Sequence, residues 1–183
     1  MKRLVILLAV IGLCAPSAWA SGLGVFGTYW KTKGGDEAFD GDGFGGGAKL
    51  KLDLVPMLSL EVRGSYISLK PKADVGGKLE IIPGEAGLVL NIVNQSKVLP
   101  YLGGGVGYYY MTPKGDEGES GKSKGEIGYY GVAGLEIELG ESLALFVEGK
   151  YTVLSWKESG DEDFSHDLKL DGFGGNAGLL LKW

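Results

Sequence analysis

Strict alternation of apolar and polar residues is the feature that most constrains this chain. From Phe44 to Leu54, apolar and small residues interleave with glycine and charged residues, and this two-residue period holds for eleven positions. The pattern resumes from Leu58 to Tyr66, after a short break at Val55-Pro56-Met57. Successive side chains of a β-strand point to opposite faces, so this period predicts strands and not helices. The two segments together predict a β-hairpin with a tight turn.

The same hairpin pattern recurs along the chain. A close copy spans Ala133 to Tyr151, and a looser copy spans Leu88 to Tyr108. One alternating segment precedes the three hairpins, from Leu23 to Trp30, and another follows them, from Phe173 to Trp183. Three hairpins and two single strands predict an all-β fold of eight strands.

The first twenty residues predict a secretory signal peptide that is removed. Lys2 and Arg3 form a cationic start, an apolar run follows, and Ala18-Trp19-Ala20 supplies a small-x-small cleavage site. The apolar run of twelve residues is too short for a helix that crosses a bilayer. We therefore divide the chain into a signal peptide, residues 1–20, and one barrel domain, residues 21–183.

Composition excludes several classes of protein. Glycine supplies 34 of the 183 residues without a collagen period, which is unfavourable for a mainly helical fold. A charged fraction of 22% beside 44% hydrophobic residues is too apolar for a disordered chain. The formal charge of −5, which becomes −7 without Lys2 and Arg3, leaves no basic surface for nucleic acid. The only cysteine, Cys14, lies in the signal peptide, and the bulky Leu13 before it disfavours lipidation.

The segments between the predicted strands alternate in length. Three are tight turns, near residues 56, 95 and 141. Four are longer, charged and rich in glycine, and they span Lys31 to Gly43, Pro71 to Gly77, Pro113 to Gly125 and Lys157 to Asp167. Along an even number of strands, this alternation places both termini and all short turns at one end. Outer-membrane barrels have this asymmetry, with short periplasmic turns and longer outer loops.

Alternation alone does not say which face points inward. A soluble lipocalin-like barrel has its apolar face inside, around a ligand, whereas a membrane barrel turns its apolar face to lipid. The signal peptide, the asymmetric connectors, the charges at mid-strand and the aromatic residues near strand ends favour the membrane barrel. These aromatic residues are Tyr66, Tyr108, Tyr110, Tyr129, Tyr151 and Trp156.

The charges of the polar face nearly balance, which suits a paired interior better than a solvated surface. They are Lys49, Lys51, Asp53, Glu61, Arg63, Glu85, Glu136, Glu138, Glu148 and Lys150. An eight-stranded barrel is only wide enough for side chains to fill. We therefore predict a salt-bridged lumen that conducts little, with a leak when Arg63 or Glu148 is changed. Lys51 and Glu61 fall opposite each other if the turn centres on Pro56, and such a buried pair needs both partners.

The chain resembles the small outer-membrane β-barrel family that includes the OmpA transmembrane domain. The resemblance covers residues 21–183 and is most specific in Pro100 to Tyr108, Leu145 to Tyr151 and Gly178 to Trp183. It implies an eight-stranded antiparallel up-and-down transmembrane barrel in the cell outer membrane, surrounded by lipid. In this family the last strand ends in an aromatic residue, usually Phe, that the barrel-assembly machinery recognises. The resemblance therefore assigns an assembly signal to Trp183.

Three motifs invite a more specific chemistry, and a structural interpretation fits each of them better. Gly103 to Gly107 resembles a phosphate-binding loop but leads into Tyr108 and not into a helix. Asp40-Gly41-Asp42-Gly43 lacks the further oxygen ligands and closing Glu of a calcium loop. His166 lies between Ser165 and Asp167, and adjacent side chains point apart, so these three do not form a catalytic relay. We predict no catalytic residue, no metal site and no cofactor.

These observations together predict a non-enzymatic, monomeric outer-membrane protein. Its expected role is envelope integrity or surface interaction through acidic extracellular loops, and its expected partners are outer-membrane lipid and, during biogenesis, the barrel-assembly machinery. Two alternatives remain open. One is a narrow channel or conduit for small ions or apolar molecules, and the other is a soluble secreted lipocalin-like barrel that binds lipid.

Overall fold

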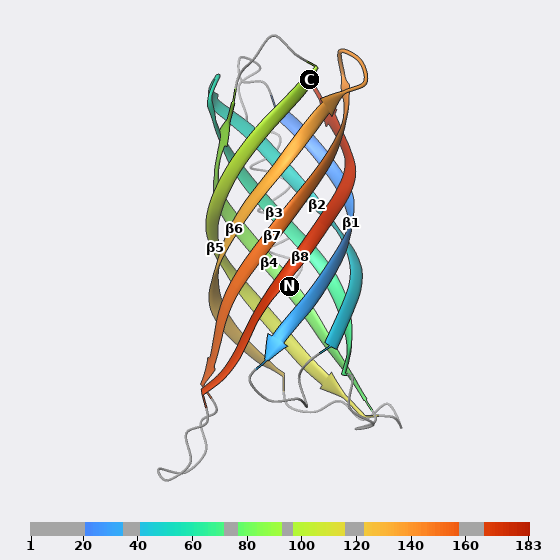
Figure 1. Ribbon diagram of the computed structural model, residues 1–183, viewed down its shortest axis with the longest axis vertical. Helices are drawn as coiled ribbons and strands as arrows, with labels where there is room; N and C mark the ends of the chain where they lie inside the picture. The colour runs from blue at the N-terminus through green and yellow to red at the C-terminus, as the bar shows by residue number, and fades with distance from the viewer. Residues whose placement is uncertain (1–20, 35–40, 72–76, 93–96, 116–122, 158–166) are drawn as a thin grey trace, which may run out of the picture.

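The computed structural model describes residues 21–34, 41–71, 77–92, 97–115, 123–157 and 167–183. They form one closed barrel, in which eight antiparallel strands follow one another in chain order (Figure 1). The strands are β1 (Ser21–Gly34), β2 (Gly41–Val55), β3 (Leu58–Pro71), β4 (Lys78–Asn91), β5 (Val98–Lys114), β6 (Lys124–Glu138), β7 (Leu143–Lys157) and β8 (Asp167–Lys182). β1 also pairs with β8, which closes the sheet. The predicted eight-stranded up-and-down barrel is confirmed.

The two ends of the barrel carry different connections. The β2–β3 and β6–β7 turns lie at the same end as the last residue of β8, the upper end in Figure 1, and we call it the turn end. Strands β1, β3, β5 and β7 end at the opposite end of the barrel, which we call the loop end. No helix within the described ranges has the length and apolarity needed to cross a membrane.

In the middle of the barrel the outer face is apolar and the inner face carries charges. On β7, Val147 is 49% exposed, whereas the next residue, Glu148, is 3% exposed. On β4, Leu88 is 49% exposed and Glu85 is 3% exposed. The alternation therefore turns its apolar side outward, as in membrane barrels. A lipocalin-like barrel requires the opposite arrangement, so this alternative is not favoured.

The strands extend further toward the loop end than the alternation predicted. The four long connectors shrink to residues 35–40, 72–77, 115–123 and 158–166. Pro113 and Asp167, for example, belong to strands and not to connectors. The turn predicted near residue 95 is longer than expected, since residues 92–97 separate β4 from β5. The asymmetry between short and long connectors is thus weaker than predicted.

The β2–β3 hairpin pairs in the predicted register. Lys51 lies opposite Glu61, and Leu52 lies opposite Leu60. The register shifts by one residue only close to the turn, between Asp53 and Val55. Because one residue of slip exchanges the two faces of a strand, this register fixes which charges of the hairpin enter the lumen.

Candidate functional site: the side chains that fill the lumen

Six charged side chains meet in the middle of the lumen because each occupies an inward position on its strand. They are Lys49 from β2, Glu61 and Arg63 from β3, Glu85 from β4, and Glu148 and Lys150 from β7. Each is at most 8% exposed. Three cations meet three carboxylates, so the group is neutral as a whole. We call it the charge layer.

Glu148 has the most partners in the charge layer. Its Oε1 accepts hydrogen bonds from Arg63 at 2.5 Å and from the Asn176 amide at 2.6 Å. Its Oε2 accepts a hydrogen bond from the Tyr101 hydroxyl at 2.7 Å and lies 3.6 Å from Lys49 Nζ. A buried carboxylate is tolerated when paired cations and donors replace the water it has lost. Glu148 therefore links β7 to strands on the far side of the barrel.

Glu61 completes this part of the charge layer. It accepts a hydrogen bond from Nη2 of Arg63, so that the guanidinium bridges two carboxylates. Lys49 Nζ lies 3.3 Å from Glu61 Oε1 and 3.7 Å from the centroid of the Phe146 ring. A cation over an aromatic face is attracted by the ring quadrupole. Every formal charge in this part of the lumen is thus paired.

A second bridge connects β7 with β4. Lys150 Nζ lies 2.8 Å from Glu85 Oε1, and the Tyr109 hydroxyl donates a hydrogen bond of 2.6 Å to the same oxygen. Tyr109 is fully buried. Its ring packs at 6.1 Å from the ring of Trp30, on the side of the loop end. Tyr109 therefore joins the charge layer to the apolar side chains on its loop-end side.

A smaller group of charges lies nearer the turn end. Lys51 Nζ is 2.9 Å from Glu136, and Lys182 Nζ is 2.6 Å from Glu138 and 3.3 Å from Glu136. These residues border a vestibule of about 470 Å³ that is open at the turn end. Lys182 was not among the predicted lumen charges. Sequence phase could have located it, because Lys182 lies between Leu181 and Trp183 of the alternating last segment and so belongs to the opposite, inward face.

The predicted pair of Lys51 and Glu61 is correct in register and wrong as an ion pair. The Lys51 amine crosses the lumen to Glu136, and Glu61 binds the other two cations of β2 and β3. Inward side chains of adjacent strands run side by side, and a narrow lumen lets a long lysine reach the far wall. Asp53 makes no ion pair with another described residue, and instead accepts a hydrogen bond from the Ser59 hydroxyl.

An apolar layer that the sequence did not predict fills the lumen at the loop end. Its buried members are Trp30, Ile67, Leu69, Leu79, Ile81, Tyr109, Met111 and Leu154. The Trp30 indole lies over Gly172, where a Cβ atom would sit 2.0 Å from the indole nitrogen. Sequence phase could have located this layer, because Ile67 and Leu69 continue the odd-numbered phase of Arg63 toward the loop end of β3.

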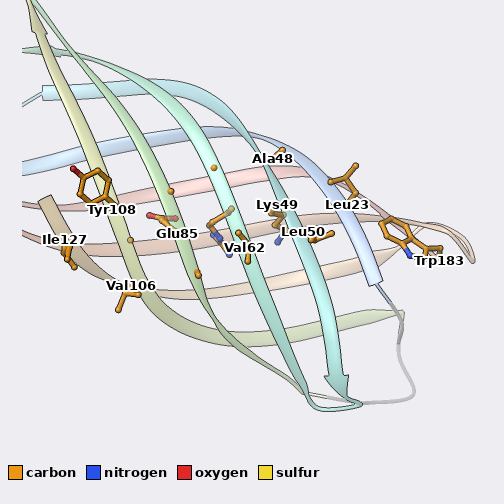
Figure 2. Close-up of a pocket in the computed structure, with 15 residues that line it drawn as sticks. Leu23, Ala48, Lys49, Leu50, Val62, Glu85, Val106, Tyr108, Ile127 and Trp183 are labelled. Carbon is orange, nitrogen blue, oxygen red and sulfur yellow. The ribbon is translucent and has the colours of Figure 1, made fainter. Parts of the chain in front are cut away.

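The outer face carries a recess of about 860 Å³ over β1 to β6. It runs from Trp183 at one end to Tyr108 and Ile127 at the other (Figure 2). The recess is hollowed where Gly64 of β3 lies directly opposite Gly84 of β4, because neither glycine has a side chain to fill the space. A Cβ atom at Gly84 would meet nothing within 4 Å, so the space beside it is open. The recess lies on the apolar outer surface and not in the lumen.

The motifs with alternative chemistry have ordinary places in the fold or lie outside the described residues. Gly103 to Gly107 belongs to β5, and a Cβ atom at Gly105 would sit 2.1 Å from the Ala86 carbonyl oxygen. Asp42 accepts a hydrogen bond of 2.7 Å from the Tyr29 hydroxyl on the outer face. Outside the described residues lie residues 1–20, which were predicted to be a signal peptide and include Cys14, together with Asp40, Asn94 to Ser96, Ser165 and His166. The side chain of Trp156 also lies outside the described part of the structure.

Comparison with known proteins identifies the family. A family model for the outer membrane protein beta-barrel domain matches residues 5–179. The chain belongs to this family. No curated protein sequence matches the chain. Membership of the family and the closed eight-stranded barrel place the protein in the cell outer membrane.

Solved structures with the same fold are outer-membrane proteins of low sequence identity. Neisserial surface protein A has a TM-score of 0.70 and 17% identity, over 90% of this chain and 99% of that chain. OprG from Pseudomonas aeruginosa has a TM-score of 0.62 and 16% identity, over 91% and 96%. Ail, the attachment invasion locus protein of Yersinia pestis, has a TM-score of 0.60 and 16% identity, over 90% and 99%, in a complex with the heparin analogue sucrose octasulfate. At these identities the likeness shows the fold alone.

Proposed function

We propose that this protein is a non-enzymatic outer-membrane barrel with a closed lumen, which acts in envelope integrity or in surface interactions through its loops. One observation carries the proposal, namely that the charge layer and the apolar layer close the lumen in series. The charge layer offers a passing ion no free charge, since its cations and carboxylates bind one another. The apolar layer offers few polar groups to replace the hydration shell of an ion, and an apolar constriction opposes wetting.

Conductance across planar lipid bilayers tests the closed lumen. We expect no steady conductance from the purified protein. Arg63→Ala opens only the charge layer and Trp30→Ala only the apolar layer, so each single variant should stay closed, whereas the double variant should conduct. This expectation differs from the sequence-based one, in which a change at Arg63 or Glu148 alone opens a leak, because the sequence did not predict the apolar layer. Steady, porin-like conductance of the unaltered protein would support the narrow-channel alternative instead.

The lumen geometry supports a role without catalysis. General acid–base or nucleophilic chemistry needs a reactive group that a substrate can reach. Glu61, Glu85 and Glu148 are at most 3% exposed, and each is held by a cation. Hydrolysis assays of purified protein with ester, peptide and acylated lipid substrates test this part of the proposal. Turnover that survives in Glu85→Gln and Glu148→Gln would place a catalytic group elsewhere.

We further propose that the loop end faces the cell exterior. The connecting segments 116–122 and 158–166 are rich in Asp and Glu, which suits a solvated surface. Two proteins with the same fold are named Neisserial surface protein A and attachment invasion locus protein, which supports a surface role by analogy. Residues 21–183 lack cysteine, so a single introduced thiol reports one position. A membrane-impermeant thiol reagent should label Ser123→Cys on intact cells and leave Ser142→Cys, at the turn end, unlabelled.

Trp183 is the residue that we propose for recognition by the barrel-assembly machinery. It follows β8 and is 64% exposed, and Leu181, two residues before it, pairs with Leu23 where β8 closes the barrel. Deleting residues 181–183 should leave the protein misassembled, because an open sheet edge in lipid leaves costly unpaired backbone groups. Deleting residues 116–122 should be tolerated and serves as the control. Normal surface display of the truncated protein would contradict the assembly role.

We also propose that the protein is a monomer, with lipid covering its apolar outer face. Cross-linking in intact membranes followed by electrophoresis should show a single barrel. The same gels should show the unheated protein shifted relative to the boiled protein, because folded membrane barrels resist detergent. A cross-linked dimer at native expression level would contradict the monomer.

A further inference from the structure

Lysines gather on the outer face at the loop end of β1 to β5. Lys31, Lys70, Lys78 and Lys114 all occupy outward positions, in one row across the sheet that also includes Asp42. Lys31 pairs with Asp42, Asp42 pairs with Lys70, and Lys78 pairs with Lys114. The pairing of Leu69 with Leu79 puts Lys70 beside Lys78. We call these four residues the lysine row.

Neighbouring carboxylates compensate only part of this charge. Glu80 lies 2.6 Å from Lys114 Nζ, and Asp42 accepts a hydrogen bond from Tyr29. Lys70 and Lys78 make no ion pair with another described residue and are exposed. Like charges on facing strands destabilise a sheet. A chain with an excess of carboxylates therefore keeps a local cluster of cations at a cost, which an anionic ligand would offset.

The lysine row lies just beyond the aromatic residues of the outer face. Lys31 follows Tyr29 by two positions, and Lys114 follows Tyr110 by four positions on the same face. Outward aromatic residues mark the boundary between hydrocarbon and headgroups in membrane barrels. Four residues of a strand span about 13 Å, less when the strand is tilted. The lysine amines therefore reach the level of the lipid headgroups.

The outer recess lies on the turn-end side of the lysine row, on the same strands. Gly64 on its floor is six residues from Lys70 along β3, and Gly84 is six residues from Lys78 along β4. The walls of the recess are apolar, with Val106 and Tyr108 of β5 among them (Figure 2). A phosphorylated lipid has an anionic headgroup and apolar acyl chains. The lysine row offers cations for the headgroup, and the recess offers an apolar surface for an acyl chain.

We propose that the lysine row and the outer recess form a docking surface for a phosphorylated lipid of the outer leaflet. The phosphate binds between Lys70 and Lys78, and one acyl chain fills the recess over Gly64 and Gly84. This inference rests on the proposed orientation, in which the loop end faces outward. A lipid suits the site better than a soluble polyanion, because the lysines share their outward face with the apolar recess.

Binding of purified protein to diphosphoryl lipid A in mixed detergent micelles tests the proposal. Lys70→Gln/Lys78→Gln should weaken binding roughly 30-fold, since each basic residue near an anionic surface contributes on the order of one kcal/mol. Lys78→Gln alone should weaken it about 5-fold by the same measure. The matched control is Lys97→Gln, which removes an exposed lysine at the turn end and should change nothing. Lys70→Arg/Lys78→Arg should restore binding, because guanidinium also pairs with phosphate.

Two further measurements separate the lipid from other occupants. Gly84→Leu fills the recess without a clash at Cβ, and it should weaken binding of lipid A but not of its water-soluble phosphorylated disaccharide. Dephosphorylated lipid A should bind no better to the unaltered protein than to the double glutamine variant. All variants must first show the mobility shift of a folded barrel.

Several outcomes would overturn the proposal. Equal binding of lipid A by the unaltered protein and the double glutamine variant would show that the lysines do not bind the lipid. Unchanged binding by Gly84→Leu would show that the recess does not hold an acyl chain. Binding of heparin that depends on the lysines, without such dependence for lipid A, would assign the row to a soluble polyanion. Because binding in micelles does not depend on orientation or conductance, failure here would leave the proposed closed lumen and surface role untouched.

Discussion

The charge layer and the apolar layer fill the same lumen with opposite chemistry. In the charge layer, Glu148 alone has contacts to four side chains, through defined hydrogen bonds and ion pairs. In the apolar layer, side chains such as Ile81 and Met111 hold the strands by packing, with at most 1% of their surface exposed. The charge layer specifies geometry but loses much when one member is removed, whereas the apolar layer tolerates changes of shape better. The lumen thus combines directional polar contacts in the charge layer with close apolar packing in the apolar layer.

The largest expected effect comes from breaking the charge layer. Glu148→Ala leaves Arg63 and Lys49 with Glu61 as their shared carboxylate, deep in the lumen. Removing one partner from a buried charge cluster costs about 3–5 kcal/mol of the free energy of unfolding. Urea titration of the barrel in micelles, followed by the mobility shift, measures this loss. Glu141→Ala, at an exposed turn position, is the control, and a loss for Glu148→Ala as small as that of the control would show that the charge layer does not hold the barrel.

The apolar layer should respond to loss of volume, and two adjacent isoleucines of β4 test it. Ile81 is 1% exposed inside the lumen, and Ile82 is 50% exposed on the outer face. Ile81→Ala should cost about 2–5 kcal/mol, because it removes packed methyl groups and leaves a cavity. Ile82→Ala loses contacts with lipid and leaves no cavity, so about 0.5 kcal/mol is expected. The same titration measures both, and equal losses would mean that the apolar layer is not a packed core.

A charge on the outer face probes the contrast between the two faces. Leu60 points outward, next to the inward Glu61 on β3. Leu60→Arg, and equally Leu52→Arg opposite it, should cost about 2–4 kcal/mol if the site lies near the bilayer midplane. Val55→Arg at the turn end should cost about 0–1 kcal/mol, since the penalty falls toward the interface. Folding titrations into lipid vesicles give the difference, and a barrel that stays soluble without detergent after either leucine change would contradict a lipid-facing surface.

The difference between the two layers also explains what the sequence could predict. Around Lys49 and Arg63 the inner face is charged and the outer face is apolar. There, alternation along the sequence predicts the strands, their register and the charges that point inward. Beyond Tyr66 the inner face of β3 becomes apolar, with Ile67 and Leu69, while its outer face becomes polar, with Ser68 and Lys70. The contrast between the faces therefore inverts, and strands traced by an apolar outer face end too early. Alternation reports that two faces differ and not how far a strand continues.

Side-chain partners could not be predicted for a related reason. Strand register gives the nearest neighbours of Lys51, but its amine binds Glu136, which is 85 residues away in the sequence. The outcome depends on the reach of each side chain across a closed barrel, and closure is a property of all eight strands together. The sequence therefore predicted most of the charges that enter the lumen, Lys182 excepted, and not which of them meet.

The smallest effect is expected at the turn end, where the lumen opens to water. Lys182 is 24% exposed in its side chain, and when it is replaced by alanine, Glu136 keeps Lys51 at 2.9 Å. Glu138 is itself 39% exposed, so water can take over the role of the lysine. Solvent-exposed ion pairs contribute about 0–1 kcal/mol, and we expect Lys182→Ala to stay within this range in the urea titration. Added salt should reduce the effect further, because exposed pairs are screened. A loss comparable to that of Glu148→Ala would mean that the turn-end charges belong to the same buried cluster as the charge layer, and that the lumen is one continuous network and not two separate groups of charges.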